Sequence, residues 1–352
     1  MHIAIIPGDG IGKEVVPQAL RVMRAAAAAF DVELTTEDLP YGADHYLSTG
    51  ETIPDSEFAR LEREFDAILL GGLGDPRVPD SRHARDILLG LRFRLDLYIN
   101  FRPIRCWRED LVPLRGKTAA DLDFVVFREN TEGLYTGHGG RMKAGTPNEV
   151  ATQTMVCTRG GVDRIVRAAF EYARAHKRKT VCMADKANAL PFVGALWRES
   201  FKAIALEFPE IVTREEYIDA LCMHLIRCPE EFDVIVTGNL FGDIVTDMGA
   251  ALQGGLGMAI SANLHPGRLG LFEPVHGTAP DIAGQGLANP FAAILTGALL
   301  MSTHGAAQAA VAIETAVRDA LGSGDTTGDI GGQLSTESAT DAVLRNLEKN
   351  LC

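Results

Sequence analysis

The chain has 352 residues, of which 46% are hydrophobic and 23% are charged, and 34 Lys and Arg against 47 Asp and Glu give a formal charge of -13. This length supports one large α/β unit or two domains, because single cores stop growing near ~250–300 residues, and it excludes a small disulfide-stapled fold. A negative chain whose longest basic run is 177–179 is not expected to bind nucleic acid.

The start of the chain and its cysteines predict a cytoplasmic protein. The first apolar run, 3–6, ends at Pro7, so we interpret it as a strand and not as a signal peptide. The longest apolar stretch, 291–301, is too short to span a bilayer. The six cysteines form no CxxC pair. We therefore expect free thiols in a reducing compartment and no contact with a membrane.

The first half of the chain alternates strands with turns and helices. A buried strand at 3–6 precedes a Gly-rich turn at 8–12 and a helix from about 14 to 30, which an alanine run favours. Further strands are predicted at 67–70, 124–127, 180–183 and 234–236, and they end at polar or Gly-rich loops. This pattern predicts an α/β fold whose ligands bind beyond the carboxyl ends of the strands.

The last third begins with a change of composition. The stretch 253–290 is rich in Gly and Pro, and we interpret it as a long functional loop. Helices are then predicted at 291–301, at 308–321 and near 336–348. The sequence has no internal repeat and no low-complexity tail.

The turn at 8–12 has the spacing GxGxG and is therefore not a dinucleotide fingerprint. That fingerprint requires GxGxxG, whose third glycine lets the helix pack closely on the strand, and Lys13 stands at that position here. Asp31 lies where a ribose-binding acid would follow, but the turn itself does not fit. We expect a tight turn near some ligand and not a standard Rossmann motif.

Three arginines lie close to predicted strand ends. Arg92 and Arg102 flank a strand-like segment at 97–101, and Arg128 follows the strand at 124–127. Guanidinium groups bind carboxylates in a bidentate manner, so the three side chains suit a substrate with two or more carboxylates. The alternative is that they are ordinary surface arginines.

Two aspartates lie four residues apart just after the strand at 234–236. If a helix begins near Gly242, Asp243 and Asp247 share one face, which suits Mg²⁺ or Mn²⁺. The alternative is a carboxylate that complements the helix dipole, which explains Asp243 but not Asp247. A third ligand is needed, and Asp219 is the candidate because it interrupts an apolar stretch.

Lys186 follows the strand at 180–183 and is a candidate base. A lysine near a metal and several arginines can have a lowered pKa and can accept a proton. Spacing alone favours the alternative, which is a solvated loop lysine.

Taken together, these segments resemble the β-decarboxylating dehydrogenases, the family of isocitrate, 3-isopropylmalate, homoisocitrate, tartrate and D-malate dehydrogenases. The resemblance covers nearly the whole chain. It rests on the segments 7–12 (PGDGIG), 128–135 (RENTEGLY), 239–257 (NLFGDIVTDMGAALQGGLG) and 273–284 (EPVHGTAPDIAG). Their order along the chain makes a chance match remote.

The resemblance implies a two-domain α/β fold with a shared mixed sheet, distinct from the standard Rossmann fold. By this resemblance, 1–100 and 253–352 form the cofactor-binding domain, and 101–252 form the dimerisation and metal/substrate domain. A homodimer is implied in which each active site uses residues of both chains.

The resemblance also assigns site residues to a metal-dependent oxidative decarboxylation of a dicarboxylate. The substrate would be held by Arg92, Arg102 and Arg128, with Leu88 and Leu89 facing its C3 substituent. Mg²⁺ or Mn²⁺ would be bound by Asp243, Asp247 and the neighbouring subunit's Asp219. Tyr135 and the neighbour's Lys186 would act as the acid–base pair.

NAD is the implied cofactor, because Asp281 followed by Ile282 resembles the NAD-dependent members. This carboxylate would accept hydrogen bonds from ribose hydroxyls and repel a 2′-phosphate. The cofactor region implied by the resemblance comprises Ile11, Asn188, His276, Gly277, Ala279, Asp281 and Asn289.

The apolar pair Leu88 and Leu89 resembles the pocket that receives the isopropyl group of (2R,3S)-3-isopropylmalate, which implies a role in leucine biosynthesis. Tartrate and D-malate dehydrogenases also have two leucines here, so these substrates are the alternative, followed by homoisocitrate and isocitrate. Arg85 stands where isopropylmalate enzymes have a glutamate, and Ala189 replaces a valine of the pocket wall. A smaller wall could admit a different group, since one methylene gives only ~1–3 kcal/mol of discrimination.

Two other classes of function compete with an enzyme. One is a regulatory subunit that binds ligand without turnover, which the filled acid–base and metal positions disfavour. The other is a binding module for acidic metabolites or RNA, which the charge disfavours.

Overall fold

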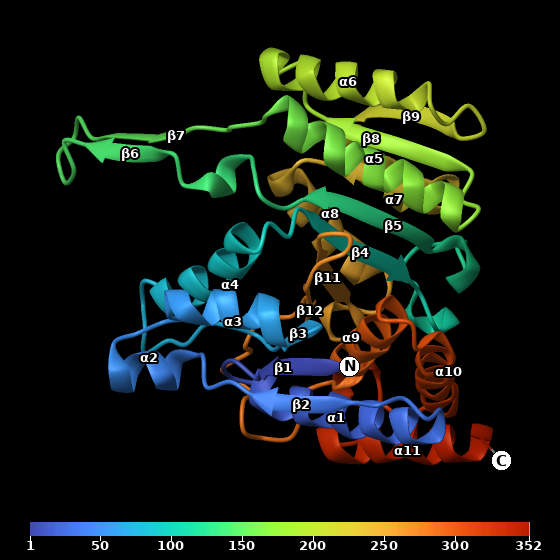
Figure 1. The fold of residues 1–352 in the computed structure, drawn as a ribbon. Coiled ribbons are helices and arrows are strands. Elements are labelled where there is room, and N and C mark those ends of the chain that lie inside the picture. Colours follow the sequence, from blue (N-terminus) through green and yellow to red (C-terminus); the bar gives the residue numbers. More distant parts are fainter. Residues whose placement is uncertain (352) are drawn as a thin grey trace. The chain divides into compact units, whose positions relative to one another are not determined.

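The computed structural model describes residues 1–351 and divides into two compact units. Unit 1 contains Met1–Leu97, Arg105–Ala119 and the segment from Ala250 onward, and unit 2 contains Tyr98–Ile104 and Ala120–Gly249. The ten strands of the main sheet are divided evenly between them (Figure 1). The predicted α/β class with a mixed sheet is confirmed.

Unit 1 contributes five strands in the order β2-β1-β3-β12-β11. These are β1 (His2–Ile6), β2 (Thr35–Asp38), β3 (Ala67–Leu70), β11 (Ile260–Leu264) and β12 (Gly270–Pro274). All pairs are parallel except β11 with β12. The continuous apolar runs of β1 and β3 are fully buried, as expected for parallel strands covered on both faces.

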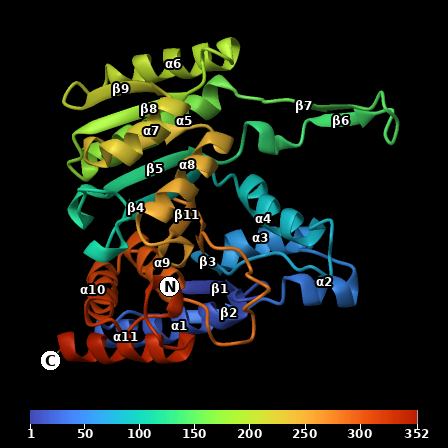
Figure 2. The ribbon, with the colours of Figure 1, turned by 180° about the vertical axis from the view of Figure 1, so that it is seen from behind.

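The helices of unit 1 surround this part of the sheet. They are α1 (Gly12–Ala29), α2 (Ala43–Thr49), α3 (Asp55–Glu64), α4 (Arg82–Arg94), α9 (Phe291–Thr303), α10 (Ala307–Ser323) and α11 (Thr336–Leu351). Helix α1 buries one face against α9 and α11, and α1 and α11 lie side by side in both views (Figures 1 and 2). Helix α9 is buried nearly throughout, which explains its long apolar run.

Unit 2 contributes the strands in the order β4-β5-β10-β8-β9. These are β4 (Ile99–Arg105), β5 (Asp123–Glu129), β8 (Thr180–Asp185), β9 (Val212–Tyr217) and β10 (Val234–Thr237). The helices are α5 (Arg159–Ala175), α6 (Pro191–Ala205), α7 (Ile218–Arg227) and α8 (Asn239–Leu252). Because β5, β8 and β10 are parallel, their carboxyl ends bring the polar residues that follow them to one edge.

A two-stranded hairpin extends from the rest of unit 2. Its strands, β6 (Gly139–Met142) and β7 (Val150–Gln153), pair antiparallel, and every residue in them is exposed. In Figures 1 and 2 the hairpin forms a long arm that no other element of unit 2 covers. A two-stranded hairpin is marginally stable by itself, so a partner surface would stabilise it.

The stretch 253–290 was predicted to be one long loop, and this prediction is wrong. It contains the hairpin-connected strands β11 and β12, whose interior is buried. Buried polar residues such as Ser261, Asn263 and Glu273 interrupt the apolar pattern of these strands. The glycines and these polar residues therefore hid two strands that the hydrophobic periodicity could not indicate.

The bounds of the units differ from those of the predicted domains by three residues at 98–100 and at 250–252, and at one longer segment. Arg105–Ala119 groups with unit 1, although the prediction placed it with the second domain. Arg108 explains this, because its guanidinium donates hydrogen bonds to the carbonyls of Leu321 (3.1 Å) and Ile330 (2.9 Å) in unit 1.

None of the helices in the described part of the chain is long and apolar enough to cross a membrane. The five cysteines among residues 1–351 are free thiols, as the sequence predicts.

Candidate active site

Arg128 occupies the carboxyl end of β5 and is almost completely buried, with 1% of its surface exposed. Its Nε and Nη2 donate to Asn239 Oδ1 at 3.0 and 2.8 Å, and its Nη1 pairs with Asp243. A Cβ on Gly242 would lie 2.6 Å from Arg128 Cγ, so the side chain can cross the first turn of α8 only because residue 242 is glycine. Helix α8 therefore fixes this guanidinium in place.

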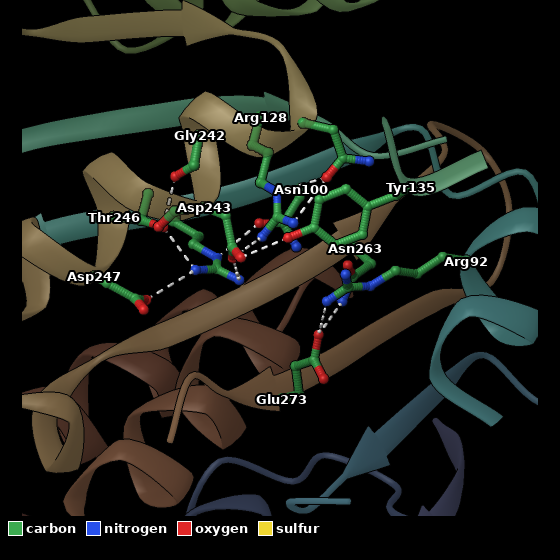
Figure 3. A network of polar contacts seen from close by, with 12 residues as sticks. Arg92, Asn100, Arg128, Tyr135, Gly242, Asp243, Thr246, Asp247, Asn263 and Glu273 are labelled. Atoms are coloured by element: carbon green, nitrogen blue, oxygen red, sulfur yellow. Dashed lines mark hydrogen bonds and ion pairs between the residues drawn. The ribbon is translucent and has the colours of Figure 1, made fainter. Parts of the chain in front are cut away.

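Arg102 lies on β4 and points toward the same helix. Its Nε donates to Asn100 Oδ1 at 2.8 Å and its Nη1 donates to Thr246 Oγ1 at 2.6 Å. Its guanidinium also lies 3.6 Å from Asp243 Oδ1 and 3.8 Å from Asp247 Oδ1. Arg102 and Arg128 thus both lie beside the aspartates of α8, and Figure 3 shows Arg128 next to Asp243.

Helix α8 begins at Asn239, three residues before the predicted start at Gly242, and presents Asp243 and Asp247 one turn apart. Tyr135 donates its hydroxyl hydrogen to Asp243 Oδ2 at 2.8 Å. Burial and the charge of Asp243 raise the pKa of Asp247, and the two arginines oppose this shift. Two carboxylates one helical turn apart, each near the other's charge, could hold a divalent cation.

Lys186 and Asp219 form a separate pair. Lys186 directly follows β8 and lies 2.7 Å from Asp219 Oδ1 at the start of α7. The hydrogen bond from Lys186 is the main cause that lowers the pKa of Asp219. The lysine is therefore ion-paired and half-buried, in contrast to the solvated loop lysine that spacing alone favours.

Within residues 1–351 of one chain, no three His, Cys, Asp or Glu side chains lie close enough to hold a metal ion. Asp219 therefore does not join Asp243 and Asp247 in a single chain. That Asp219 and Lys186 serve the site of a neighbouring copy stays a prediction.

In unit 1, Arg92 lies near the end of α4 and pairs with a buried acid. Its Nη2 donates to Glu273 Oε1 at 2.8 Å, and Asn263 Nδ2 donates to the same oxygen at 2.9 Å (Figure 3). Leu88 and Leu89 precede Arg92 by four and three residues on α4 and are half-buried, and Leu88 packs partly on the core of unit 1. Their side chains therefore leave part of an apolar surface accessible, one turn of α4 before Arg92.

Four of the residues predicted to bind the cofactor lie on the loop after β12 in unit 1, namely His276, Gly277, Ala279 and Asp281. Burial lowers the pKa of His276, its Nδ1 contacts the Gly277 carbonyl at 2.9 Å, and its buried Nε2 has no partner among the described residues. Ala279 has a φ of 39°, a left-handed conformation that costs energy for a residue with a side chain. Asp281 is exposed. An orphaned buried nitrogen and a strained loop both suit a ligand site.

Three other predicted cofactor residues have different surroundings. Ile11 is buried, and its N–H donates to the Thr278 carbonyl at 2.9 Å. Asn289 accepts from the Phe291 N–H and donates to Asp329, so its side chain anchors the start of α9. Asn188 is exposed in unit 2, two residues after Lys186.

The sequence interpretation missed the residues that orient the arginines. Asn239 holds Arg128, Thr246 and Asn100 hold Arg102, and Glu273 holds Arg92. The one available signal was Glu273, a charged residue in an otherwise apolar strand, which indicates a buried ion pair. The others depend on pairings between distant segments.

Comparisons with known proteins show the family of the chain. Residues 2–343 match the family model described as isocitrate/isopropylmalate dehydrogenase. A protein of Streptomyces griseus named 3-isopropylmalate dehydrogenase is 47% identical over 97% of this chain and 99% of its own. One of the same name from Nocardia farcinica is 49% identical over 90% of this chain and 93% of its own.

Solved structures give the same fold. The crystal structure of isocitrate dehydrogenase from Methylococcus capsulatus superposes with a TM-score of 0.90 at 36% identity, covering 98% of this chain and 99% of that one. A protein from Thermus thermophilus gives a TM-score of 0.88 at 34% identity, covering 98% of this chain and 68% of that one. The likeness thus extends over nearly the whole chain.

Proposed function

Since the chain belongs to the isocitrate/isopropylmalate dehydrogenase family, we propose that it catalyses the metal-dependent oxidative decarboxylation of a 3-substituted D-malate, with (2R,3S)-3-isopropylmalate as the substrate, in leucine biosynthesis. The observation that carries the proposal is the grouping of Arg102, Arg128, Tyr135, Asp243 and Asp247 in unit 2. This set offers cations for substrate carboxylates, carboxylates for a metal and a phenol for proton transfer.

NAD is the proposed oxidant, bound by the loop after β12. Asp281 is exposed and free to accept hydrogen bonds from ribose hydroxyls, and its charge would repel the 2′-phosphate of NADP. His276 offers a buried acceptor at Nε2. The check is kcat/KM with each nucleotide: NAD should be strongly preferred, and equal efficiency with NADP contradicts this part of the proposal.

Mg²⁺ or Mn²⁺ is the proposed metal, held by Asp243 and Asp247 of one chain and Asp219 of its partner. Carboxylate oxygens are the ligands these hard cations prefer, and burial together with the charge of Asp243 raises the pKa of Asp247, a shift that a bound cation would oppose. When bound, NAD accepts the hydride from C2 and the cation stabilises negative charge on the C2 oxygen.

The side chains of the protein supply the remaining steps. Arg92, Arg102 and Arg128 bind the two carboxylates and orient the C2–H bond. Lys186 accepts the proton of the C2 hydroxyl as the alcohol is oxidised to a ketone. After the C3 carboxylate leaves as CO₂ with its bonding electrons on the carbon framework, Tyr135 donates a proton to C3. Each acid–base group contributes on the order of 10²–10⁴ in rate.

A homodimer would complete this site, with Lys186 and Asp219, which are ion-paired with each other, supplied by the partner chain. The exposed apolar side chains Met223 and Ile226 on α7, Ile244 on α8 and Met142 and Val150 on the hairpin would then contact the partner. Such groups of exposed apolar residues are typical of interfaces.

Subunit complementation tests the shared site. Lys186→Met and Asp243→Asn should each be inactive alone. An equimolar mixture that has exchanged subunits should regain about a quarter of wild-type activity, since about half of its dimers are heterodimers and one of the two sites in each heterodimer is intact. The absence of recovery in dimers that demonstrably exchange subunits would contradict the shared site.

The substrate is tested by metal-dependent NAD reduction with 3-isopropylmalate, D-malate, tartrate, homoisocitrate and isocitrate. The half-buried Leu88 and Leu89 favour the isopropyl group, so 3-isopropylmalate should have the highest kcat/KM. A preference for D-malate or tartrate would contradict the proposed substrate but not the proposed mechanism. It would indicate that Arg85 and Ala189 account for the difference in substrate from the isopropylmalate enzymes.

A further inference from the structure

The Gly-rich turn before α1 packs against the protein's own backbone. Gly8 and Gly10 have φ values of 69° and 52°. A Cβ on Gly8 would lie 2.2 Å from the Gly72 carbonyl oxygen, and a Cβ on Gly10 would lie 2.1 Å from the Thr278 carbonyl oxygen. The N–H groups of Asp9 and Ile11 donate to these same carbonyls at 2.7 and 2.9 Å. In a dinucleotide fingerprint such N–H groups face phosphate, whereas here the protein occupies them.

Asp9, in the middle of this turn, accepts hydrogen bonds from three directions. Its side chain is 1% exposed. Oδ1 accepts from the Ala43 N–H at 2.7 Å, and Oδ2 accepts from the Gly74 N–H at 2.9 Å and lies 2.9 Å from His83 Nε2. One carboxylate thus joins the start of α2, the loop after β3 and the first turn of α4.

His83 carries this connection into α4. It is fully buried, and because a carboxylate only accepts hydrogen bonds, its Nε2 is the protonated nitrogen that donates to Asp9. It is the second residue of α4, the helix that also carries Leu88, Leu89 and Arg92. The angle of α4, and with it the position of those three side chains, is therefore tied to the turn.

Glu14, in the first turn of α1, makes the corresponding connection on the cofactor side. One carboxylate oxygen accepts from the Gly284 N–H, and the other accepts from the Gly286 N–H at 3.0 Å. Gly284 and Gly286 both have left-handed φ values, 78° and 67°, and follow Asp281 on the same loop. Glu14 therefore fixes the backbone that presents Asp281.

We propose that Asp9, in the turn at 8–12, and Glu14, in the first turn of α1, are positioning residues. Asp9 acts through His83 and fixes the substrate-facing helix α4, and Glu14 fixes the NAD-facing loop 279–286. The assignment of the two sides rests on the proposed function. A Rossmann motif binds phosphate at this place, whereas here the turn has a structural role. The carboxylates of Asp9 and Glu14 control different kinetic parameters.

The substrate side is tested with three His83 variants. A glutamine amide can reproduce the Nε2 donor, whereas leucine has no donor and asparagine is too short to reach Asp9. We expect His83→Leu and His83→Asn to lower kcat/KM for the hydroxyacid about 10- to 100-fold, with His83→Gln much closer to wild type. The KM for NAD should change less than about twofold.

The cofactor side is tested with Glu14→Gln. An amide directs an N–H₂ group at one of the two backbone donors, so one hydrogen bond is lost and replaced by repulsion. We expect the KM for NAD to rise about tenfold with little change in the KM for the hydroxyacid. The matched control is Glu348→Gln, on the exposed side of α11, which should change neither value.

Hydrogen exchange of the nucleotide-free protein separates this inference from the proposed function. His83→Leu should accelerate exchange in the first turns of α4, and Glu14→Gln should accelerate it in 279–286, even if NAD is not the cofactor. Unchanged exchange in both segments, or both variants altering the two KM values equally, would overturn the inference. A wild-type protein inactive with every substrate would overturn the proposed function alone.

Discussion

The carboxylates of the two units are satisfied in different ways. In unit 1, Asp9 and Glu273 are buried, and each accepts at least two hydrogen bonds from donors of the same chain. In unit 2, the side chains of Asp243, Asp247 and Asp219 keep 36%, 64% and 67% of their surface exposed. The first group is complete once the chain has folded, whereas the second keeps negative charge at an accessible place. These acids of unit 1 therefore form a framework, whereas those of unit 2 are accessible for the proposed metal.

The largest effect that sharpens this comparison is expected at Lys186 in unit 2. Lys186→Met should lower kcat on the order of 10²–10⁴ while leaving the thermal melt unchanged, because the proposed role of the lysine is proton transfer and not packing. Steady-state kinetics and calorimetry measure the two effects. Lys349→Met, near the end of α11, is the control, and an unchanged kcat in Lys186→Met would remove its proposed role.

Substitution of a buried acid of unit 1 should lower the stability of the fold, in contrast to the loss of kcat expected at Lys186. Glu273→Gln weakens a charged hydrogen bond to the buried Arg92, so we expect a loss of about 2 kcal/mol in the free energy of unfolding. Urea denaturation measures it, and the loss should be the same with and without Mg²⁺. A loss that appears only with Mg²⁺ would break the comparison between the units.

Asp247 of unit 2 should combine unchanged stability with weaker metal binding. Asp247→Asn removes repulsion from Asp243 and no close hydrogen bond, so the free energy of unfolding without metal should change by less than about 0.5 kcal/mol. The Mg²⁺ concentration for half-maximal activity should rise about tenfold or more, as expected when a ligand oxygen loses its charge. A metal titration of the wild-type and variant proteins measures this rise. Equal Mg²⁺ requirements would exclude Asp247 as a ligand.

The smallest effect is expected at His276. Burial lowers its pKa below the ordinary value of 6.5, so below that pH the unfolded chain binds a proton that the folded chain refuses. The free energy of unfolding should therefore fall as the pH is lowered through 6.5, and His276→Gln should show a smaller fall. Urea denaturation at about pH 7.5 and about pH 5 measures the difference. Identical pH dependence in the two proteins would contradict this origin.

The framework strands could be predicted because they are continuous apolar runs. The predicted strand at 67–70 coincides with β3, and the helix predicted from about 14 corresponds to α1, which begins at Gly12. Strands β11 and β12 could not be predicted, since Asn263 and Glu273 are buried only through their pairing with each other and with Arg92. That pairing joins segments far apart in the sequence.

The candidate site could be predicted to the extent that its residues lie at or after the carboxyl ends of strands. Arg128 lies at the end of β5, Lys186 directly follows β8, and Asp243 lies on α8, the helix that follows β10. The resemblance assigned their roles. Asn239 follows a strand as well, but its role depends on the path of the Arg128 side chain over Gly242. Residues that act by orienting another side chain have no local signature.

Strands β2 and β9 stand at the two ends of the strand order, so each leaves one row of backbone donors and acceptors available to another molecule. Both carry charged residues there, Glu37 and Asp38 on β2 and Arg214, Glu215 and Glu216 on β9. An incoming strand would have to desolvate these charges before it could add to the sheet. The same sequence that ends the sheet thus protects the folded protein against edge-to-edge aggregation.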